Sequence, residues 1–417
     1  QACVLLSSDG TLVWSKTMQL VFLGIVFLVI VILLALKRPL YQAILGALIA
    51  AALLYRIPPR AILSQTARVF TDWNSFSVLV SLYLITYLQR MLEARSQIKL
   101  AQLDLNGLFH NRRVNAAGAP LFIGLLPSAA AMILCADIVK DATDGYLDSK
   151  EQAFVTSWFR HIPESTLPTY TGVLLMASLS GQSLGRFMLG MIIPMIVLAL
   201  VGYFPYFLRL PRDPGTPRSE NRARDALNLV KHLWSLLLIL VLILAFDFQV
   251  VTAVLAVIVL AAFVYRFSFA ELKGFLVSAF EVKLLLNTFL ILVLKEFISY
   301  TGVLTLLPAV LSTLPIPEWL VFAIMFFVGG AISGSNGIIA LGTPLAFSTF
   351  DGGIPLMVLL MCMCHAASLI SPVHVCLVVA SDYFKITMGQ LIRKTIPASL
   401  VFALLMIGYY LLLTLIV

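Results

Sequence analysis

Long apolar segments alternate with short polar segments along most of this chain. Windows of about 18 or more apolar residues recur, and each is long enough to cross the hydrocarbon core of a bilayer as a helix. The pattern predicts an all-α polytopic membrane protein. In the first half we predict helices at 18–36, 40–55, 76–92 and 184–207, an amphipathic stretch at 60–71, a re-entrant hairpin at 116–143 and a broken helix at 150–180.

The second half of the chain repeats this order of elements. We predict helices at 229–246, 250–265, 284–298 and 386–417, an amphipathic stretch at 269–280, a hairpin at 319–350 and a broken helix at 354–380. Each half would cross the membrane five times, with one hairpin that returns to its own side. Because five is an odd number, the second half starts on the opposite side of the membrane and is inverted. Two inverted repeats with helices broken at the midplane are typical of a secondary transporter with its substrate site between the repeats.

Polar segments divide the chain into four parts. We interpret residues 1–17 as a non-native or disordered N-terminal extension, 18–207 as the first repeat and 229–417 as the second. Residues 208–228 form a proline-rich, basic linker between the repeats. Basic loops favour the cytoplasmic side. A cytoplasmic linker predicts that both termini lie outside the inner, or plasma, membrane.

Composition supports the membrane class and excludes others. The chain is 61% hydrophobic and 12% charged, with a mean hydropathy of +1.01, which no soluble domain of this size needs. A closed barrel would show weak alternating strands instead. The net charge of +8 sits mostly in short loops, so it reports topology and does not indicate a nucleic-acid partner. The cysteines are interpreted as small buried apolar residues, not a disulfide framework: Cys3, Cys135, Cys362, Cys364 and Cys376.

One motif occurs in both predicted broken helices. His161 precedes Pro168 by seven positions, and His365 precedes Pro372 by the same spacing. Ionisable groups inside a membrane are costly and indicate function. We therefore expect these two segments to contribute to one site.

The first broken helix carries the ionisable candidates. Glu164 and His161 suit proton transfer, and Arg160 suits the carboxylate of a substrate. A structural alternative is that Arg160 and Glu164, four positions apart, neutralise each other, or that Arg160 lies at the cytoplasmic interface. The polar neighbours are Ser165, Thr166, Thr169, Tyr170 and Thr171.

The hairpin tips are the second source of candidates. The tip around Ser335 and Asn336 combines oxygen ligands with glycine, which suits Na⁺ or a carboxylate at a helix N-terminus. Close packing of small residues is the structural alternative. The first tip, with Ser128 and Ala129, lacks an asparagine and would bind through backbone groups. Asp137, in the second arm of that hairpin, is either functional or interfacial.

These considerations define two overlapping sets of residues. The predicted substrate-binding residues are Ser128, Ala129, Arg160, His161, Ser165, Thr166, Thr169, Ser333, Ser335, Asn336, His365 and Ser371. The predicted ion- or proton-coupling residues are Glu164, Asp137, Ser128, Ser335, Asn336, Gly337, Thr343 and Ser368. His365 has a structural histidine as its alternative interpretation.

No metal cofactor is predicted. Cys362, Cys364 and His365 superficially resemble a metal cluster, but adjacent residues on one helix do not converge on one ion. Na⁺ at Ser335 and Asn336 would be a coupling ion, as would H⁺, and no organic cofactor is expected.

The arrangement resembles the ion transporter superfamily, which includes dicarboxylate/sodium symporters and arsenite permeases. The resemblance covers nearly the whole chain after Met18, and is greatest to an uncharacterised integral-membrane branch. The tip Ser335-Asn336-Gly337 is similar to the Ser-Asn-Thr signature of the dicarboxylate members, whereas the first tip departs from it. The resemblance implies an elevator mechanism in a homodimer, with 60–71 and 269–280 as interfacial arms.

Three functions remain open at this level. The leading prediction is a secondary active transporter that moves a small organic anion, coupled to Na⁺ or H⁺, and not an enzyme. The first alternative is a cation/proton antiporter that uses Glu164 or Asp137. The second, from another class, is an intramembrane serine hydrolase that uses Ser335 and His365.

Overall fold

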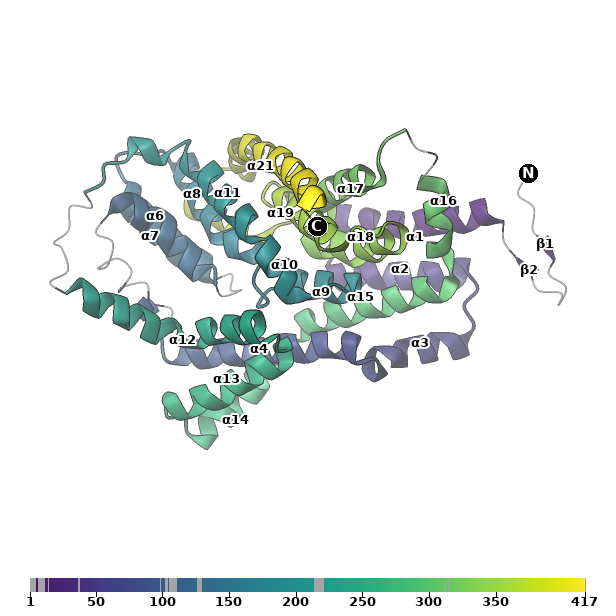
Figure 1. Cartoon of the computed structure of the whole chain (residues 1–417), viewed down its shortest axis with the longest axis horizontal. Helices are drawn as coiled ribbons and strands as arrows, with labels where there is room; N and C mark the ends of the chain where they lie inside the picture. Colours follow the sequence, from purple (N-terminus) through teal and green to yellow (C-terminus); the bar gives the residue numbers. More distant parts are fainter. Residues whose placement is uncertain are drawn as a thin grey trace.

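The chain folds almost entirely into helices. The computed structural model describes residues 5–6, 12–13, 15–36, 38–97, 99–101, 104, 111–125, 130–213, 221–311, 313 and 315–416. Two short strands near the N-terminus, β1 (Leu5–Leu6) and β2 (Leu12–Val13), pair antiparallel. The remaining described elements are helical, as the sequence predicts (Figure 1).

The helices of the first half follow the predicted order. They are α1 (Lys16–Ala35), α2 (Leu40–Leu54), α3 (Pro59–Thr71), α4 (Trp73–Ala94), α6 (Arg112–Ile123), α7 (Ala130–Thr143), α8 (Ser149–His161), η1 (Ile162–Ser165), α9 (Thr171–Ser180), α10 (Leu184–Gly190), α11 (Ile192–Tyr203) and η2 (Phe207–Arg209). The segment predicted as one helix at 184–207 is divided at Met191 into α10 and α11.

The second half follows the same order. Its elements are α12 (Arg222–Phe246), α13 (Val250–Val264), α14 (Phe269–Ser278), α15 (Val282–Thr301), η3 (Val303–Leu306), α16 (Leu307–Leu311), α17 (Glu318–Ser333), α18 (Ser335–Thr349), α19 (Gly353–Ser368), α20 (Val375–Tyr383) and α21 (Met388–Ile416).

Several helices begin earlier than the sequence indicates, and polar residues cap α12 and α1 among them. The Asn221 side chain accepts a hydrogen bond from the Arg224 backbone at 3.0 Å, so α12 extends into the predicted linker. The Ser15 hydroxyl accepts one from the Met18 backbone at 3.3 Å, and α1 starts within the predicted N-terminal extension. Such caps satisfy amides that have no partner in the first turn.

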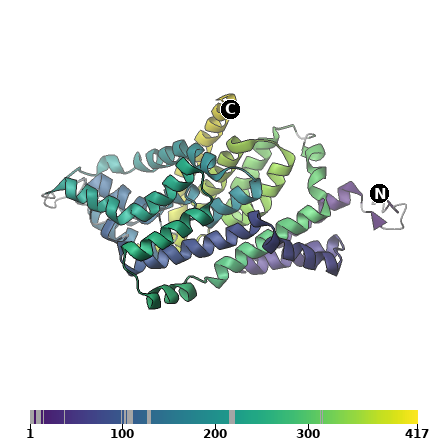
Figure 2. The same ribbon diagram turned by 60° about the horizontal axis from the view of Figure 1, so that its bottom comes forward.

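By length and composition alone, six helical segments of the described residues could cross a membrane, although one of them, Glu318–Thr349, folds back on itself as described below. A seventh is the pair α14 and α15, taken as one bent span. The six segments are Lys16–Leu34, Trp73–Ala94, Leu184–Tyr203, Arg222–Phe246, Glu318–Thr349 and Met388–Leu415. Figure 2 shows α4 running along one side of the molecule, where it packs on α13 and α14. These lengths are those of a multi-pass membrane protein.

The segment Glu318–Thr349 does not run straight, because the chain reverses at Gly334. A Cβ added at Gly342 would lie 2.5 Å from the Phe326 ring, and one added at Gly329 would lie 2.5 Å from Ile338. Residues at nearly equal distances from Gly334 along the chain therefore face each other, so α17 and α18 form a hairpin. Its arms have 16 and 15 residues, about 22–24 Å each, less than the ~30 Å hydrocarbon core.

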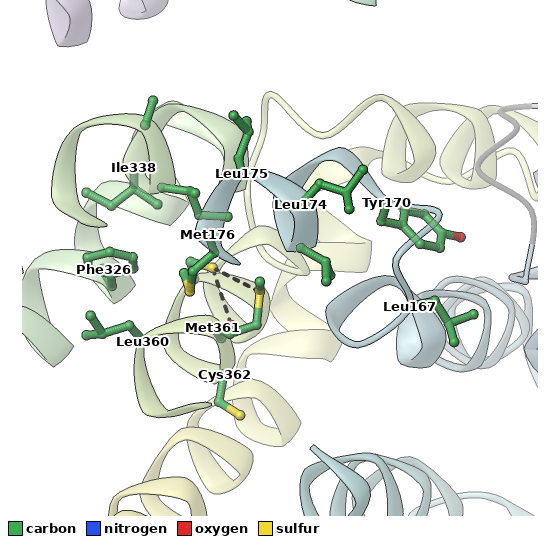
Figure 3. Packing of buried hydrophobic residues seen from close by; sticks show 14 of the residues in the cluster. Leu167, Tyr170, Leu174, Leu175, Met176, Phe326, Ile338, Leu360, Met361 and Cys362 are labelled. Carbon is green, nitrogen blue, oxygen red and sulfur yellow. Dashed lines mark hydrogen bonds between the residues drawn. The ribbon is translucent and has the colours of Figure 1, made fainter. Parts of the chain in front are cut away.

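The hairpin and the broken helices pack into one buried apolar cluster. In the first half, α9 contributes Leu175 and Met176. They lie beside Ile338 of α18 and Met361 of α19 (Figure 3). α9 packs on α18, and α17 packs on α19. The core therefore joins the interrupted segments of both halves.

We expect Gly334→Ala to destabilise the protein by about 1–3 kcal/mol, since this backbone region is essentially open to glycine alone. Gly334 has φ 74° and ψ 166°. The matched control is Gly24→Ala in α1, where an added Cβ meets nothing within 4 Å. Thermal unfolding in detergent would measure both. Equal melting temperatures for the two variants would contradict the role of Gly334.

Candidate functional site

The first helix break follows α8 directly. α8 ends at His161, the 3₁₀ turn η1 follows, and α9 starts at Thr171. Pro163 and Pro168 fall within the break. Because proline has no backbone N–H, a continuous helix cannot pass through these positions without loss. The break therefore has a cause in the sequence.

The second break has a similar construction. α19 ends at Ser368, and α20 starts at Val375 with His374 as its N-cap residue. Pro372 lies between the two helices. Both breaks therefore leave backbone groups without helical partners inside the protein, and these groups must find other partners.

Side chains in each break bond to backbone carbonyls of the hairpin in the same half. The Tyr170 hydroxyl donates to the carbonyl of Gly124, and the Thr169 hydroxyl donates to that of Leu125 at 3.4 Å. In the second half, the Ser371 hydroxyl donates to the carbonyl of Ala331 at 2.8 Å. These bonds satisfy carbonyls at or after the ends of α6 and α17.

A cavity of about 100 Å³ lies where the two halves meet. It is lined by Glu164, Ser165, Tyr170, Thr171, Gly172, Ser335, Asn336, Ile339, Met361, Cys364 and His365. The first break, the tip of the second hairpin and α19 all contribute to it. The structure thus brings together five of the predicted site residues, Glu164, Ser165, Ser335, Asn336 and His365.

Two helix N-termini meet at this cavity. α9 begins with Thr171 and Gly172, and α18 begins with Ser335 and Asn336. Neither helix has a side-chain hydrogen bond at its N-cap. A Cβ at Gly172 would lie 3.3 Å from the Asn336 amide oxygen, so the two first turns are close. Each N-terminus carries free amides and the positive end of a helix dipole.

Two of the titratable side chains that line the cavity, Glu164 and His365, are predicted site residues. His365 is 3% exposed, and its Nε2 has no hydrogen-bond partner in the described part of the chain. The Glu164 carboxylate lies 3.5 Å from Nε2 of His161 and is 25% exposed. The Ser335 hydroxyl donates to the carbonyl of Cys364 at 3.5 Å, which directs its proton to the backbone and not to His365.

The other predicted residues lie outside the cavity lining. Arg160 and His161 are buried in the last turn of α8. The Arg160 carbonyl packs so closely on Gly124 that a Cβ there would lie 2.1 Å from it. Thr343 and Gly337 are buried in α18. Asp137 is exposed and accepts a hydrogen bond from Tyr383.

The remaining predicted hydroxyls bond locally. Ser333 donates to Gly329 at 2.7 Å, and Ser368 donates to His365 at 2.8 Å, each to a backbone carbonyl. Thr166 lies 3.4 Å from the Ser165 hydroxyl, and Thr169 and Ser371 bond to the hairpins as described above. Ser128 and Ala129 fall outside the described residues.

Sequence reasoning missed four lining residues, Gly172, Ile339, Met361 and Cys364. Helical periodicity could have indicated two of them, because Met361 lies one turn from His365 and Ile339 lies one turn from Asn336. Cys362, by contrast, lies 3.9 Å from the Met191 sulfur. The two cysteines of α19 therefore face different surroundings.

A family model matches residues 19–413, almost the entire chain, and is described as a protein of unknown function, DUF401. The chain belongs to the DUF401 family. No curated protein matches it. Among solved structures, this DUF401 chain is similar to the YdaH transporter of Alcanivorax borkumensis, described as having an unusual topology. The TM-score is 0.53 at 16% identity, over 85% of this chain and 87% of that one. The DUF401 chain therefore has the fold of a membrane transporter.

We expect Ser371→Ala in this DUF401 protein to cost about 1–3 kcal/mol, because it leaves the half-buried Ala331 carbonyl without its side-chain partner. The matched control is Ser368→Ala. The carbonyl to which Ser368 bonds, that of His365, also accepts the Leu369 amide at 3.3 Å, so the control should cost less than about 1 kcal/mol. Denaturant or thermal unfolding compares them, and an equal loss in both would show that the bond to the hairpin is unimportant.

Proposed function

We propose that this protein is a secondary active transporter for a small organic anion, which binds in the cavity between the two halves. The observation that carries the proposal is the meeting of two uncapped helix N-termini, one from each half, on one cavity. Helix N-termini bind anions through free amides and a partial positive charge of about +0.5 each.

The cavity side chains support a carboxylate as the bound group. Thr171 and Ser335 offer hydroxyls, Asn336 offers an amide, and His365 presents a buried ring nitrogen. A volume of about 100 Å³ is a few times the ~30 Å³ of one water molecule. The substrate would therefore be an anion with few heavy atoms, and the polar groups would fix its orientation.

The Glu164 carboxylate gives a physical reason for coupling the binding of the anion to the binding of H⁺ or Na⁺. An anion in this cavity would lie within a few ångströms of Glu164, and two like charges repel each other there. Either a proton on Glu164 or Na⁺ beside Ser335 and Asn336 would offset the repulsion. Both coupling ions therefore stay in the proposal, and one experiment separates them.

We infer an elevator mechanism from the order of the elements. The two halves share one order, which supports inverted repeats, and the short arms of α17 and α18 support a re-entrant hairpin. The hairpins and broken helices would move as one unit, with α3 and α14 as interfacial arms. This arrangement supports membership in the ion transporter superfamily. A homodimer in the inner membrane, with a cytoplasmic linker at 208–228 and both termini outside, completes the proposal.

The direct test is thermal stability of the purified protein against a panel of small carboxylates, with Na⁺ or choline as the cation, at two pH values. Ligands that bind the native state raise its stability, by about 2.7 kcal/mol at one hundred times Kd. We expect at least one carboxylate to stabilise the protein. A need for Na⁺ would identify sodium symport, and dependence on pH alone would identify proton coupling. Stabilisation by cations with no carboxylate effect would overturn the anion proposal and favour the antiporter.

We expect Glu164→Gln to tighten anion binding about 10- to 100-fold at neutral pH. A charge about 5 Å away at an effective dielectric constant of about 20 contributes roughly 3 kcal/mol of repulsion, less where water screens it. Asp137→Asn is the matched control, because Asp137 lies outside the cavity lining and should leave affinity unchanged. Titration calorimetry measures both. Weaker binding in Glu164→Gln, or an equal change in both variants, would contradict this account.

A further inference from the structure

Three potential metal ligands gather beside the cavity without lining it. His161 ends α8 in the first half, and His374 and Cys376 begin α20 in the second. One ligand atom from each residue lies within 4.8 Å of the other two. The His161 and His374 rings lie edge to face, with their centroids 4.6 Å apart. The cluster therefore joins the two helix breaks.

Hydrogen bonds hold both imidazoles in the orientation that metal-bound histidines commonly have. Nδ1 of His161 bonds to the Ser157 carbonyl, and Nδ1 of His374 bonds to the Ser368 carbonyl at 3.0 Å. A carbonyl only accepts, so each Nδ1 carries the hydrogen, and each neutral ring keeps its lone pair on Nε2. Metal-bound histidines commonly donate their other N–H to such a carbonyl.

The burial of the three residues would allow a metal ion to enter from the side of His374 and Cys376. His161 is fully buried at 0% exposure, and its Nε2 has no hydrogen-bond partner among the described residues. The nearest carboxylate, that of Glu164, lies 3.5 Å from it. His374 and Cys376 are half-buried, which leaves a path for an ion. A buried, unpartnered nitrogen directed at two further ligands is costly unless something binds it.

We propose that His161, His374 and Cys376 bind a borderline or soft transition-metal cation, of which Zn²⁺ is the representative. Zn²⁺ takes Cys thiolates and His imidazoles as ligands, and a site with three protein ligands leaves its fourth position to water. Zn–N and Zn–S bonds of about 2.0–2.3 Å place tetrahedral ligands about 3.3–3.8 Å apart, so ligand atoms within 4.8 Å of one another need to close by at most about 1.5 Å. The three ligands lie outside the lining of the proposed substrate cavity, with Glu164 of that lining 3.5 Å from Nε2 of His161. The inference does not depend on the proposed function.

Metal binding would hold the two breaks together. Because α8 and α20 belong to opposite halves of the sequence, one ion would clamp both, and binding to the native state stabilises it by mass action. The competing explanation is that the two imidazoles only pack against each other. In that explanation the Cys376 thiol only hydrogen-bonds to His374, and no metal affinity is predicted.

The test uses the full-length protein in detergent, stripped of metal by a chelator and titrated with Co²⁺ and then with Zn²⁺. We expect one equivalent of Co²⁺ to produce thiolate-to-cobalt charge-transfer absorption, which Zn²⁺ then displaces. Cys376→Ser should abolish that absorption, and His374→Ala should weaken binding more than about 100-fold. The matched control, Cys364→Ser, removes a buried thiol that lies outside the cluster and should leave both unchanged.

Melting temperatures in chelator establish that each variant folds. Three results would overturn the proposal: no Co²⁺ or Zn²⁺ binding to the wild-type protein, binding without thiolate absorption, or equal absorption and affinity in Cys376→Ser and the wild type. Loss of the absorption in Cys364→Ser alone would also overturn it, because the thiolate would then belong to α19.

Discussion

The structure depends on one constraint: backbone groups released by broken helices inside an apolar protein must find new partners. In the first half, Tyr170 bonds to the Gly124 carbonyl. In the second, Ser371 bonds to that of Ala331. Each break is thereby tied to the hairpin of its own half. The amides at the starts of α9 and α18 have no side-chain cap, and the first residues of both helices line the cavity. The same constraint therefore explains both the packing and the site.

Close approach of the backbone is the second requirement of this arrangement. Gly124 packs directly on the Arg160 carbonyl, and Gly342 packs on the Phe326 ring. At Gly334 the hairpin turns through a conformation that other residues avoid. Gly124 thus brings the first hairpin against α8, and Gly334 and Gly342 bring the two arms of the second hairpin together.

Much of the fold could be predicted from the sequence, because apolar length and proline positions directly limit where helices run. The predicted break at Pro163 and Pro168 and the turn at Gly334 both occur. The ends of the helices were harder to predict, because capping residues such as Asn221 extend α12 into a polar segment. Of the site, the sequence indicated Glu164, Asn336 and His365, which line the cavity. It did not indicate that His161, His374 and Cys376 converge, because their proximity arises only when opposite halves pack together.

The most direct test of the central claim is a cryo-electron microscopy structure in a lipid nanodisc with the most stabilising carboxylate. The account predicts density for the anion between the first turns of α9 and α18, within hydrogen-bond distance of the amides of Gly172 and Asn336. It also predicts that the same position is free of such density without the ligand. Anion density elsewhere, with the α9 and α18 N-termini unoccupied, would contradict the claim that these two helix ends form the substrate site.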